Sequence, residues 1–400
     1  MENPKIRFKG FTKDWEQRKL GDVFKEYSEK NHTELSALTI IQGGGTVKRE
    51  DSDRNLMYDT SNLSNYKMVR KDDFIVHLRS FEGGLEKSSL DGIISPAYHT
   101  FHSDMADSRF YYPYFRSYEF IKHKLVSHVY GIRDGRSIDI DGMKTIEIPY
   151  TSIEEQRKIG DYLDCLDHLI TLHQRKCEQT KKLKKYMLQK MFPQNGAKVP
   201  EIRFDGFTYD WEQRKLGEIY GSIGNAFVGT ATPYYAEHGH FYLESNNVKD
   251  GQINHNAEIF INDEFYEKQK DKWLHTGDMV MVQSGHVGHA AVIPEELDNT
   301  AAHALIMFRN PKEEIEPYFL NYEYQTDKAK KQIENITTGN TIKHILASDM
   351  QEFVVDIPKY EEQKVIASYF CKLDHLITLH QRKCDELKKM KKYMLQNMFI

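Results

Sequence analysis

Four short loops combine basic, amide and hydroxyl side chains, which are the types that can form hydrogen bonds with nucleic-acid bases and phosphates. They are residues 78–84 and 130–137 in the first half of the chain, and residues 282–289 and 337–343 in the second half. Each loop combines polar side chains with glycine, which permits a close approach of the backbone. Arginine and lysine pair with guanine in the major groove, and asparagine and glutamine pair with adenine. The candidate residues are Arg79, Ser80, Arg133, Arg136, Ser137, Gln283, Ser284, His286, Asn340, Thr341 and Lys343.

Three of these residues fit a phosphate contact better than a base contact. Ser137, Thr341 and Lys343 would position a nucleic acid without specifying its sequence. When the two halves of the chain are compared, Arg79 aligns roughly with Gln283. The alternative is that all four loops are ordinary turns between strands, with polar tips that face solvent.

The sequence contains no arrangement of residues that is typical of a catalytic centre. It has no Walker A motif, no paired zinc ligands on a helix and no glycine-rich nucleotide-binding fingerprint. The three glycines at 43–45 are typical of a flexible loop rather than a phosphate cradle, and residues 95–98 match only part of the motif with which adenine methyltransferases hold a flipped base. The carboxylates are dispersed instead of clustered around a magnesium site. We therefore expect a binding protein with no catalytic residue, no metal and no cofactor.

The composition is typical of a soluble globular protein. The chain has 400 residues, of which 39% are apolar and 12% aromatic, and its mean hydropathy is −0.67. No apolar run approaches the roughly 18 residues of a membrane span, and the start of the chain lacks a secretory signal, so we expect a cytoplasmic protein. Four scattered cysteines predict neither a disulfide framework nor a zinc site. Because the net charge is −5, any DNA-binding surface must be a local patch or be shared with partner subunits.

The chain is an internal duplication. Residues 6–21 recur at 202–217 with two of sixteen positions changed, and residues 167–177 recur unchanged at 374–384. The wider segments 153–192 and 360–399 agree at about two thirds of their positions, whereas the regions between the repeats share little. Each half therefore has a common opening, a divergent domain and a common closing segment.

Both closing segments are predicted to be long helices. Each begins with an acidic turn that suits the helix dipole, and apolar residues follow at alternating spacings of four and three. A helix of this length would extend about 57 Å at 1.5 Å per residue. The two copies are expected to pack antiparallel on each other, although a coiled coil between separate chains is the alternative. The predicted seam consists of Leu163, Leu166, Ile170, Phe370, Leu373 and Ile377.

The predicted fold class is α+β, with two similar mixed α/β domains separated by these two helices. The predicted boundaries are 1–152 for the first domain, 153–192 for the first helix, 193–199 for a linker, 200–358 for the second domain and 359–400 for the second helix. Strands are expected at 74–78, 146–148, 279–282 and 353–357. Further helices are expected at 114–129 and 316–333, starting near Pro113 and Pro317.

This layout resembles that of the specificity subunits of type I restriction-modification systems, over essentially the whole chain. The resemblance is carried by the motif at 14–21 with its copy at 210–217, the Glu-Gln-rich helix starts, the prolines before them, and a short element at 135–138 that returns at 339–342. It implies two target recognition domains, each of which reads one half of an asymmetric bipartite DNA sequence. It further implies that the helices set the gap between the half-sites and dock methyltransferase subunits, two in number, with restriction and translocase subunits joining that core.

The sequence allows more than one role for the lysine runs and more than one function for the chain. The lysine runs at 181–185 and 388–392 could contact DNA between the half-sites, contact partner subunits, or face solvent. The competing hypotheses are a methyltransferase-nuclease fragment with its own chemistry, which the missing motifs disfavour, and a coiled-coil scaffold that binds only protein.

Overall fold

The computed structural model describes residues 3–52, 60–131, 136–194, 196–339 and 343–399. The chain forms two compact units. Unit 1 comprises Met1–Gln174 and Arg382–Ile400, and unit 2 comprises Arg175–Gln381. Each unit therefore contains one divergent domain together with parts of both long helices.

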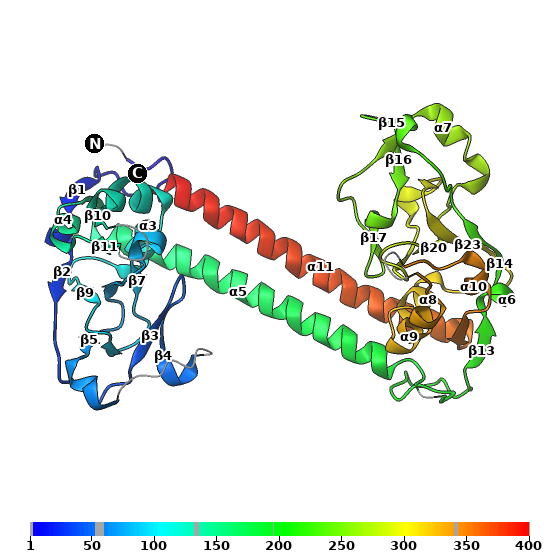
Figure 1. Cartoon of the computed structure of the whole chain (residues 1–400), viewed down its shortest axis with the longest axis horizontal. Helices are drawn as coiled ribbons and strands as arrows, with labels where there is room; N and C mark the ends of the chain where they lie inside the picture. The colour runs from blue at the N-terminus through cyan, green and yellow to red at the C-terminus, as the bar shows by residue number, and fades with distance from the viewer. Residues whose placement is uncertain (1–2, 53–59, 132–135, 195, 340–342, 400) are drawn as a thin grey trace. The chain divides into compact units, whose positions relative to one another are not determined.

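Unit 1 is built around an antiparallel four-stranded sheet with the order β2-β9-β6-β7. Its strand β6 is apolar throughout because both faces are covered. Four two-stranded ladders, β1-β12, β3-β4, β5-β8 and β10-β11, surround the sheet (Figure 1). The strands are β1 (Glu16–Lys19), β2 (Lys25–Tyr27), β3 (Leu38–Ile41), β4 (Gly45–Lys48), β5 (Lys67–Val69), β6 (Phe74–Val76), β7 (Glu86–Lys87), β8 (Gly92–Ile94), β9 (His99–His102), β10 (Val129–Tyr130), β11 (Ser137–Ile138) and β12 (Glu147–Tyr150). The short helices are α1 (Leu20–Val23), α2 (Ser80–Gly83), α3 (Ser108–Phe115) and α4 (Ile140–Lys144).

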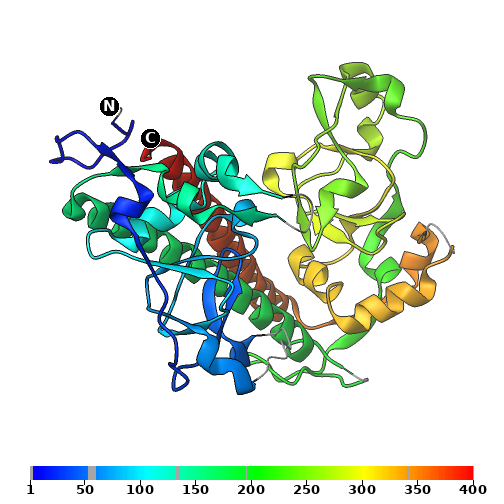
Figure 2. The ribbon, with the colours of Figure 1, turned by 60° about the vertical axis from the view of Figure 1, so that its left-hand side comes forward.

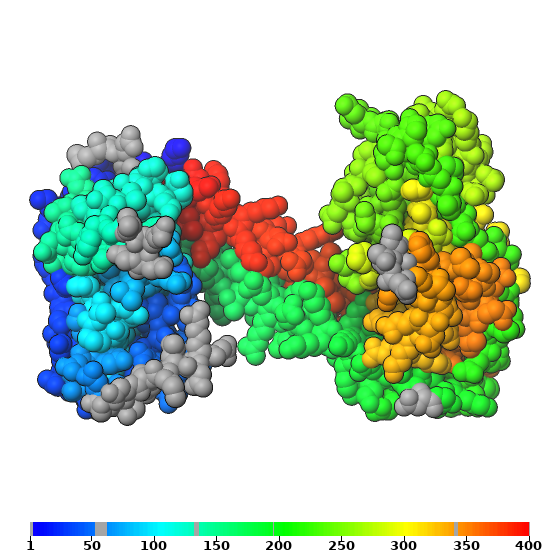
Figure 3. Space-filling view, viewed as in Figure 1, coloured from blue at the N-terminus to red at the C-terminus, as the bar shows by residue number. Residues whose placement is uncertain are grey.

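Unit 2 repeats this plan and adds to it. Its sheet β14-β23-β20-β21 has the same order and the same antiparallel pairing as that of unit 1. A second sheet, β15-β19-β16-β22, lies with α7 at one end of the unit, at its top in Figures 1 and 2. The strands are β13 (Glu212–Lys215), β14 (Tyr220–Asn225), β15 (Tyr235–Ala236), β16 (His240–Leu243), β17 (Val248–Lys249), β18 (Gln252–Ile253), β19 (Phe260–Ile261), β20 (Met279–Val282), β21 (Ala290–Val292), β22 (Ala301–Ala302), β23 (Leu305–Pro311) and β24 (Val354–Ile357). The helices are α6 (Leu216–Ile219), α7 (Asp263–Glu267), α8 (Pro317–Glu323), α9 (Asp327–Ile336) and α10 (Ala347–Gln351); Figure 3 shows α9, coloured amber, on the face turned to the viewer.

The two long helices are α5 (Ile153–Lys190) and α11 (Tyr360–Asn397), and they pair antiparallel within each unit. In unit 1 the start of α5 shares a core with the end of α11, and in unit 2 the start of α11 shares a core with residues at the end of α5. Of the predicted seam, Leu163, Leu166, Ile170, Phe370 and Leu373 are buried, whereas Ile377 is half-buried. The predicted fold class, with mixed helix and sheet domains and two antiparallel helices, is confirmed.

The opening segment of each half closes its unit in the same way. The Ile6 N–H donates to the carbonyl of Asn397 at 2.9 Å in unit 1, and the Ile202 N–H donates to the carbonyl of Lys190 at 2.8 Å in unit 2. Strand β1 then pairs with β12, and β13 pairs with β24. The repeated opening residues therefore join each domain to the end of one long helix and to the strand that precedes the other.

The predicted helix at 114–129 is wrong. Helix α3 starts earlier because Asp107 caps it, accepting a hydrogen bond from the Arg109 N–H at 2.9 Å. Pro113 lies inside α3 instead of at its start. After α3 ends, the chain continues as a short π-helix (Phe120–Lys124) and a 3-10 helix (Leu125–His128).

The predicted single helix at 316–333 is also wrong. It divides into α8 and α9, because the Thr326 hydroxyl accepts a hydrogen bond from the Ala329 N–H at 3.2 Å and caps α9. The four cysteines are free; Cys177 and Cys384 are buried, Cys371 is half-buried and Cys165 is exposed.

Candidate nucleic-acid interface

In unit 1, the two loops predicted to contact a nucleic acid lie next to each other. Arg79 precedes α2 at the end of the turn that follows β6, and Ser137 belongs to β11. The guanidinium of Arg136 lies over the ring of Phe81, 5.4 Å from its centroid. Arg79, Arg136 and Ser137 are all exposed. Two loops that are distant in sequence therefore present basic and hydroxyl side chains from one region of the unit.

Ser80 does not belong to this exposed set. It is fully buried, and its hydroxyl accepts a hydrogen bond from the His77 N–H at 2.9 Å. The Nδ1 atom of His77 in turn faces the Arg79 N–H at 3.3 Å. Burial lowers the pKa of His77, so its ring is neutral at physiological pH. Ser80 and His77 therefore shape the turn that displays Arg79.

The equivalent loops of unit 2 are also adjacent. The Ile345 N–H donates to the carbonyl of Gln283 at 2.9 Å, and the Gly285 N–H donates to the carbonyl of Lys343 at 3.0 Å. Ser284 forms an antiparallel bridge with His344. Of the predicted contact residues, Arg133, Asn340 and Thr341 lie outside the residues that the structure describes.

The structure refines the correspondence between the first loops of the two units. Asp73 and Asp278 occupy equivalent positions, because the N–H of Ser88 and the N–H of Ile293 donate to their carbonyls at 2.8 Å. Counting from these residues, Arg79 corresponds to Ser284 and not to Gln283. The rough sequence alignment was therefore displaced by one residue.

A cleft of about 970 Å³ opens beside the loops of unit 2. His286 and Lys343 line it, so two of the predicted contact residues face the same space. Lys181, Lys184 and Lys185, near the end of α5, line the same cleft. Residues of α8, α9 and α11 contribute to the lining as well, including Lys330 and Ile377. The position of Ile377 at this cleft explains why it is only half-buried. The cleft thus joins the predicted loops to one of the lysine runs.

The glycine turn at residues 43–45 of unit 1 is bound to a buried carboxylate. Glu86 is fully buried and accepts hydrogen bonds from the N–H of Gly43 at 2.7 Å, the N–H of Gly45 at 3.3 Å and the hydroxyl of Tyr112 at 2.8 Å. Arg116 is its ion-pair partner. Gly43 and Gly45 therefore bind a carboxylate of their own chain, and the Gly44 N–H donates to the carbonyl of Ile41 at 2.8 Å, in place of the flexible loop expected from the sequence.

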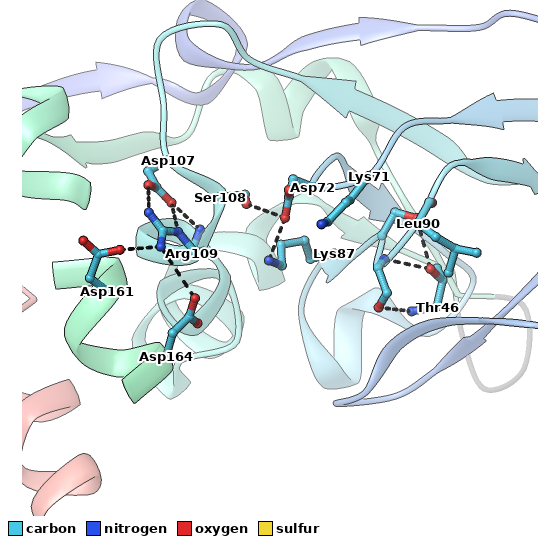
Figure 4. A network of polar contacts seen from close by, with 12 residues as sticks. Thr46, Lys71, Asp72, Lys87, Leu90, Asp107, Ser108, Arg109, Asp161 and Asp164 are labelled. Carbon is cyan, nitrogen blue, oxygen red and sulfur yellow. Dashed lines mark hydrogen bonds and ion pairs between the residues drawn. The ribbon is translucent and has the colours of Figure 1, made fainter. Parts of the chain in front are cut away.

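Helix α3 is fixed to α5 by a second charged network (Figure 4). Arg109 donates to Asp107 at 2.6 Å and to Asp161 of α5 at 2.5 Å, and it lies 3.7 Å from Asp164. The Asp107 N–H donates to the side chain of Gln156 at 2.9 Å. The domain of unit 1 is thereby attached to the first turns of its long helix.

The repeated motifs prove to be partners of one another. In unit 1, Glu155 accepts hydrogen bonds from Arg7 at 2.6 Å and from the indole of Trp15 at 3.1 Å. In unit 2, Glu362 accepts from Arg203 at 2.7 Å. The duplication of both segments was visible in the sequence, but their contact was not, because 148 residues separate Arg7 from Glu155. These residues join domain to helix.

Among the residues that the structure describes, no group of three or more His, Cys, Asp or Glu side chains is placed to hold a metal ion. No helix in the described part of the chain combines the length and the apolar character that crossing a membrane requires.

Comparison with known families gives a match over most of the chain. A family model described as the type I restriction modification DNA specificity domain matches residues 12–182 and again residues 209–389. The two matches cover the two halves that the internal repeat defines.

Two curated relatives come from Methanocaldococcus jannaschii. The type I restriction enzyme MjaVIII specificity subunit is 25% identical over 268 residues, which is 64% of this chain and 62% of that protein. The putative type I restriction enzyme MjaX specificity subunit is 27% identical over 272 residues, which is 65% of this chain and 60% of that protein. The chain thus spans about three fifths of the length of each relative.

The fold is also similar to that of a solved structure. The crystal structure of the S subunit of a type I restriction-modification system from M. genitalium aligns with 100% of this chain and 99% of that chain, with a TM-score of 0.63. The sequences are 15% identical, so this likeness concerns the fold alone.

Proposed function

The chain belongs to the type I restriction modification DNA specificity domain family, of which it carries two copies, and we propose that it selects the DNA sequence for a type I restriction-modification complex. In this proposal each unit reads one half of an asymmetric bipartite site in double-stranded DNA. The chain itself performs no reaction, and its partners supply the methyl transfer and the cleavage.

The observation that carries the proposal is the convergence of polar loops in both units. Arg79 and Arg136 are exposed on neighbouring loops of unit 1, and Gln283 and Lys343 lie on neighbouring loops of unit 2. Side chains of these types read base edges in the major groove. Because the loops differ between the units while the supporting sheets match, the two units would read different half-sites. Ser80 is left out of the proposed contacts because it is buried.

We further propose that the lysines at the end of α5 contact the DNA backbone. Lys181 and Lys185 line the same cleft as His286 and Lys343 of the predicted loops. DNA held by the loops would therefore pass within reach of these ammonium groups, which favours DNA over a partner subunit for this face. Such contacts position the duplex and carry no sequence information.

The proposed protein partners are two methyltransferase subunits, joined by restriction and translocase subunits. Duplicated exposed surfaces support two equivalent docking sites. Tyr186 of α5 and Tyr393 of α11 are equivalent aromatic residues, 50% and 57% exposed. The edge-to-face ring pair of Phe8 with Tyr162 in unit 1 likewise recurs as Phe204 with Tyr369 in unit 2, where it borders a surface groove. Matching partners would meet such matching surfaces.

Methylation mapping tests the proposal against a scaffold that binds only protein. DNA is sequenced by a single-molecule method from cells that express the chain with its cognate methyltransferase subunit. We expect methylated adenines in one split motif, and no such methylation when the chain is omitted. If both proteins are soluble and associated and methylation still has no sequence preference, the scaffold function is correct instead.

A further inference from the structure

One hairpin occupies the same place in both units and carries an exposed glutamine, at its turn in unit 1 and directly after its turn in unit 2. In unit 1, β3 and β4 form a hairpin that contacts β7 at the edge of the four-stranded sheet. In unit 2, β17 and β18 form a shorter hairpin that contacts β21, the equivalent edge strand. The tip residues include Gln42 in the first hairpin, and Gln252 directly follows the turn of the second.

Each hairpin tip packs against the loop that follows the equivalent central strand. In unit 1 the amide nitrogen of Gln42 lies only 2.2 Å from the position that a Cβ on Gly83 would take, so the side chain crosses α2 at its glycine. In unit 2 the Asp250 N–H faces Nδ1 of His289 at 3.3 Å. In each unit the hairpin tip is therefore a third loop, next to the two loops that contain the predicted contact residues.

The backbone of both tips is held firmly. In unit 1, the N–H groups of Gly43 and Gly45 donate to Glu86, and the Ser89 N–H donates to the Thr46 hydroxyl at 2.9 Å. In unit 2, the side chain of Asn321 donates to the carbonyl of Gly251 at 2.8 Å. Contact residues on a supported backbone lose less freedom on binding.

The glutamine side chains, in contrast, remain available for hydrogen bonding to a ligand. Gln42 and Gln252 are exposed, and neither side chain forms a hydrogen bond with any residue that the structure describes. Gln252 also lines the cleft that contains His286 and Lys343. A glutamine amide offers one acceptor and two donor hydrogens, and it pairs with both N6 and N7 of adenine in the major groove.

From this geometry we propose that Gln42 and Gln252 each read a base, one in each half-site. The inference rests on the proposed function and extends it to a loop that the predicted contact residues do not include. Gln42 works beside Arg79 and Arg136 in unit 1, and Gln252 works beside His286 in unit 2.

The test is methylation mapping of cells that express Gln42→Ala or Gln252→Ala with the methyltransferase subunit. We expect Gln42→Ala to accept additional bases at one position of one half-site, with a loss of about 10- to 100-fold in discrimination there. Gln252→Ala should relax one position of the other half-site. The remaining positions of the motif should be unchanged in both variants.

A glycine substitution provides a second, independent variant. In Gly83→Ala the new methyl group would displace the end of the Gln42 side chain, which is flexible, so the fold should tolerate it. Gly83→Ala should therefore relax the same base position as Gln42→Ala, and combining the two should add nothing. Gln17→Ala is the matched control, because Gln17 is an exposed glutamine of β1, and it should leave the motif intact.

The outcomes separate this inference from the function on which it rests. If the wild-type chain directs methylation to a split motif but Gln42→Ala and Gly83→Ala keep that motif unchanged, the role of Gln42 is refuted and the function stands. If the wild-type chain directs no sequence-specific methylation, the function itself fails. Complete loss of methylation with an unchanged unfolding temperature supports a base contact, whereas loss with a lowered unfolding temperature shows that the glutamine is structural.

Discussion

At the scale of single residues, the buried glutamates at the starts of the long helices connect domain to helix. Glu155 is 1% exposed and accepts hydrogen bonds from Arg7, Trp15 and Thr151. Glu362 holds Arg203 in the same way, yet the indole nitrogen of Trp211 is buried without a hydrogen-bond partner among the described residues. The network is therefore more complete in unit 1 than in unit 2.

Glu155→Gln should destabilise unit 1. The substitution leaves Arg7 without its ion-pair partner in a largely buried site, and breaking a buried pair in this way costs about 3 kcal/mol. Chemical denaturation of the variant checks this value. Glu154→Gln is the matched control, because Glu154 is the exposed neighbour, and the loss of its interaction with the helix dipole should cost at most about 1 kcal/mol. Equal effects of the two substitutions would contradict the assigned role.

The contribution of Glu155 should also depend on pH. Burial alone would raise its pKa, but hydrogen bonds from Arg7 and Thr151, with the charge of Arg7, lower the pKa below its ordinary value. A lowered pKa in the folded state stabilises the fold above the unfolded pKa of about 4.3, and this stabilisation is lost as the pH falls through the folded pKa. The difference between wild type and Glu155→Gln should therefore shrink below about pH 4. Denaturation curves at neutral and acidic pH would show a constant difference if this reasoning were wrong.

At the scale of elements, the duplication places the same ion pair in both units at different depths. Lys184 and Asp374 join the long helices in unit 2, where their side chains are 12% and 13% exposed and the Tyr322 hydroxyl also donates to Asp374 at 2.8 Å. Lys391 and Asp167 join them in unit 1 at 2.7 Å, with side chains 28% and 54% exposed. Buried pairs are much more sensitive to the loss of one partner than exposed pairs.

Asp374→Asn should therefore cost more stability than Asp167→Asn. We expect about 2 to 3 kcal/mol for the first and at most about 1 kcal/mol for the second. Denaturant unfolding of the two variants provides the comparison. The double variant Lys184→Asp with Asp374→Lys reverses the pair and should recover part of the stability lost in unit 2. Equal losses for Asp374→Asn and Asp167→Asn would show that the burial of the ion pair does not determine its contribution.

The elements differ in how far sequence predicts them. The long helices follow from an apolar periodicity sustained over many turns, and α5 begins at Ile153 as predicted. The helix expected at 114–129 starts earlier than predicted, because the side chain of Asp107 caps α3. The helix therefore begins five residues before Pro113, which was the predicted start signal. Asp107 and Pro113 are both typical of a helix start, and the folded structure uses only Asp107 in this way.

The sequence likewise predicts some features of the candidate site and not others. The adjacency of the loops within each unit could be expected, because the loops follow equivalent strands of a duplicated fold. The burial of Ser80 could not, because it depends on a hydrogen bond with the backbone of His77 that only the folded turn forms. The role of Gln42 could not be expected either: the three glycines that follow it indicate a loop, but its contact with Gly83 arises only when the sheet assembles.

At the scale of the whole molecule, the two halves keep alike the residues that join domain to helix and differ in the loops. Tyr186 and Tyr393 are equivalent, exposed and apolar, and they stand among lysines. Exposed aromatic residues are frequent anchors of protein interfaces. They are therefore the residues with which we test the two proposed docking sites.

Tyr186→Ala and Tyr393→Ala should each weaken one of two methyltransferase sites, by about tenfold or more. The stoichiometry of the purified complex, measured by native mass spectrometry, should fall from two methyltransferase subunits to one in each single variant. Tyr118→Ala is the control, because Tyr118 is 72% exposed in unit 1 and lies outside both helices. Two subunits bound with unchanged affinity in all three variants would place the docking surface elsewhere.

The independence of the two units is tested most directly by exchanging one of them. Residues 22–150 are replaced by the corresponding segment of a family member with a different methylation motif, and the DNA of cells that express the hybrid with the methyltransferase subunit is mapped. We expect one half of the split motif to change and the other half to remain. If both halves change together, or if neither changes while methylation persists, the assignment of one half-site to each unit is contradicted.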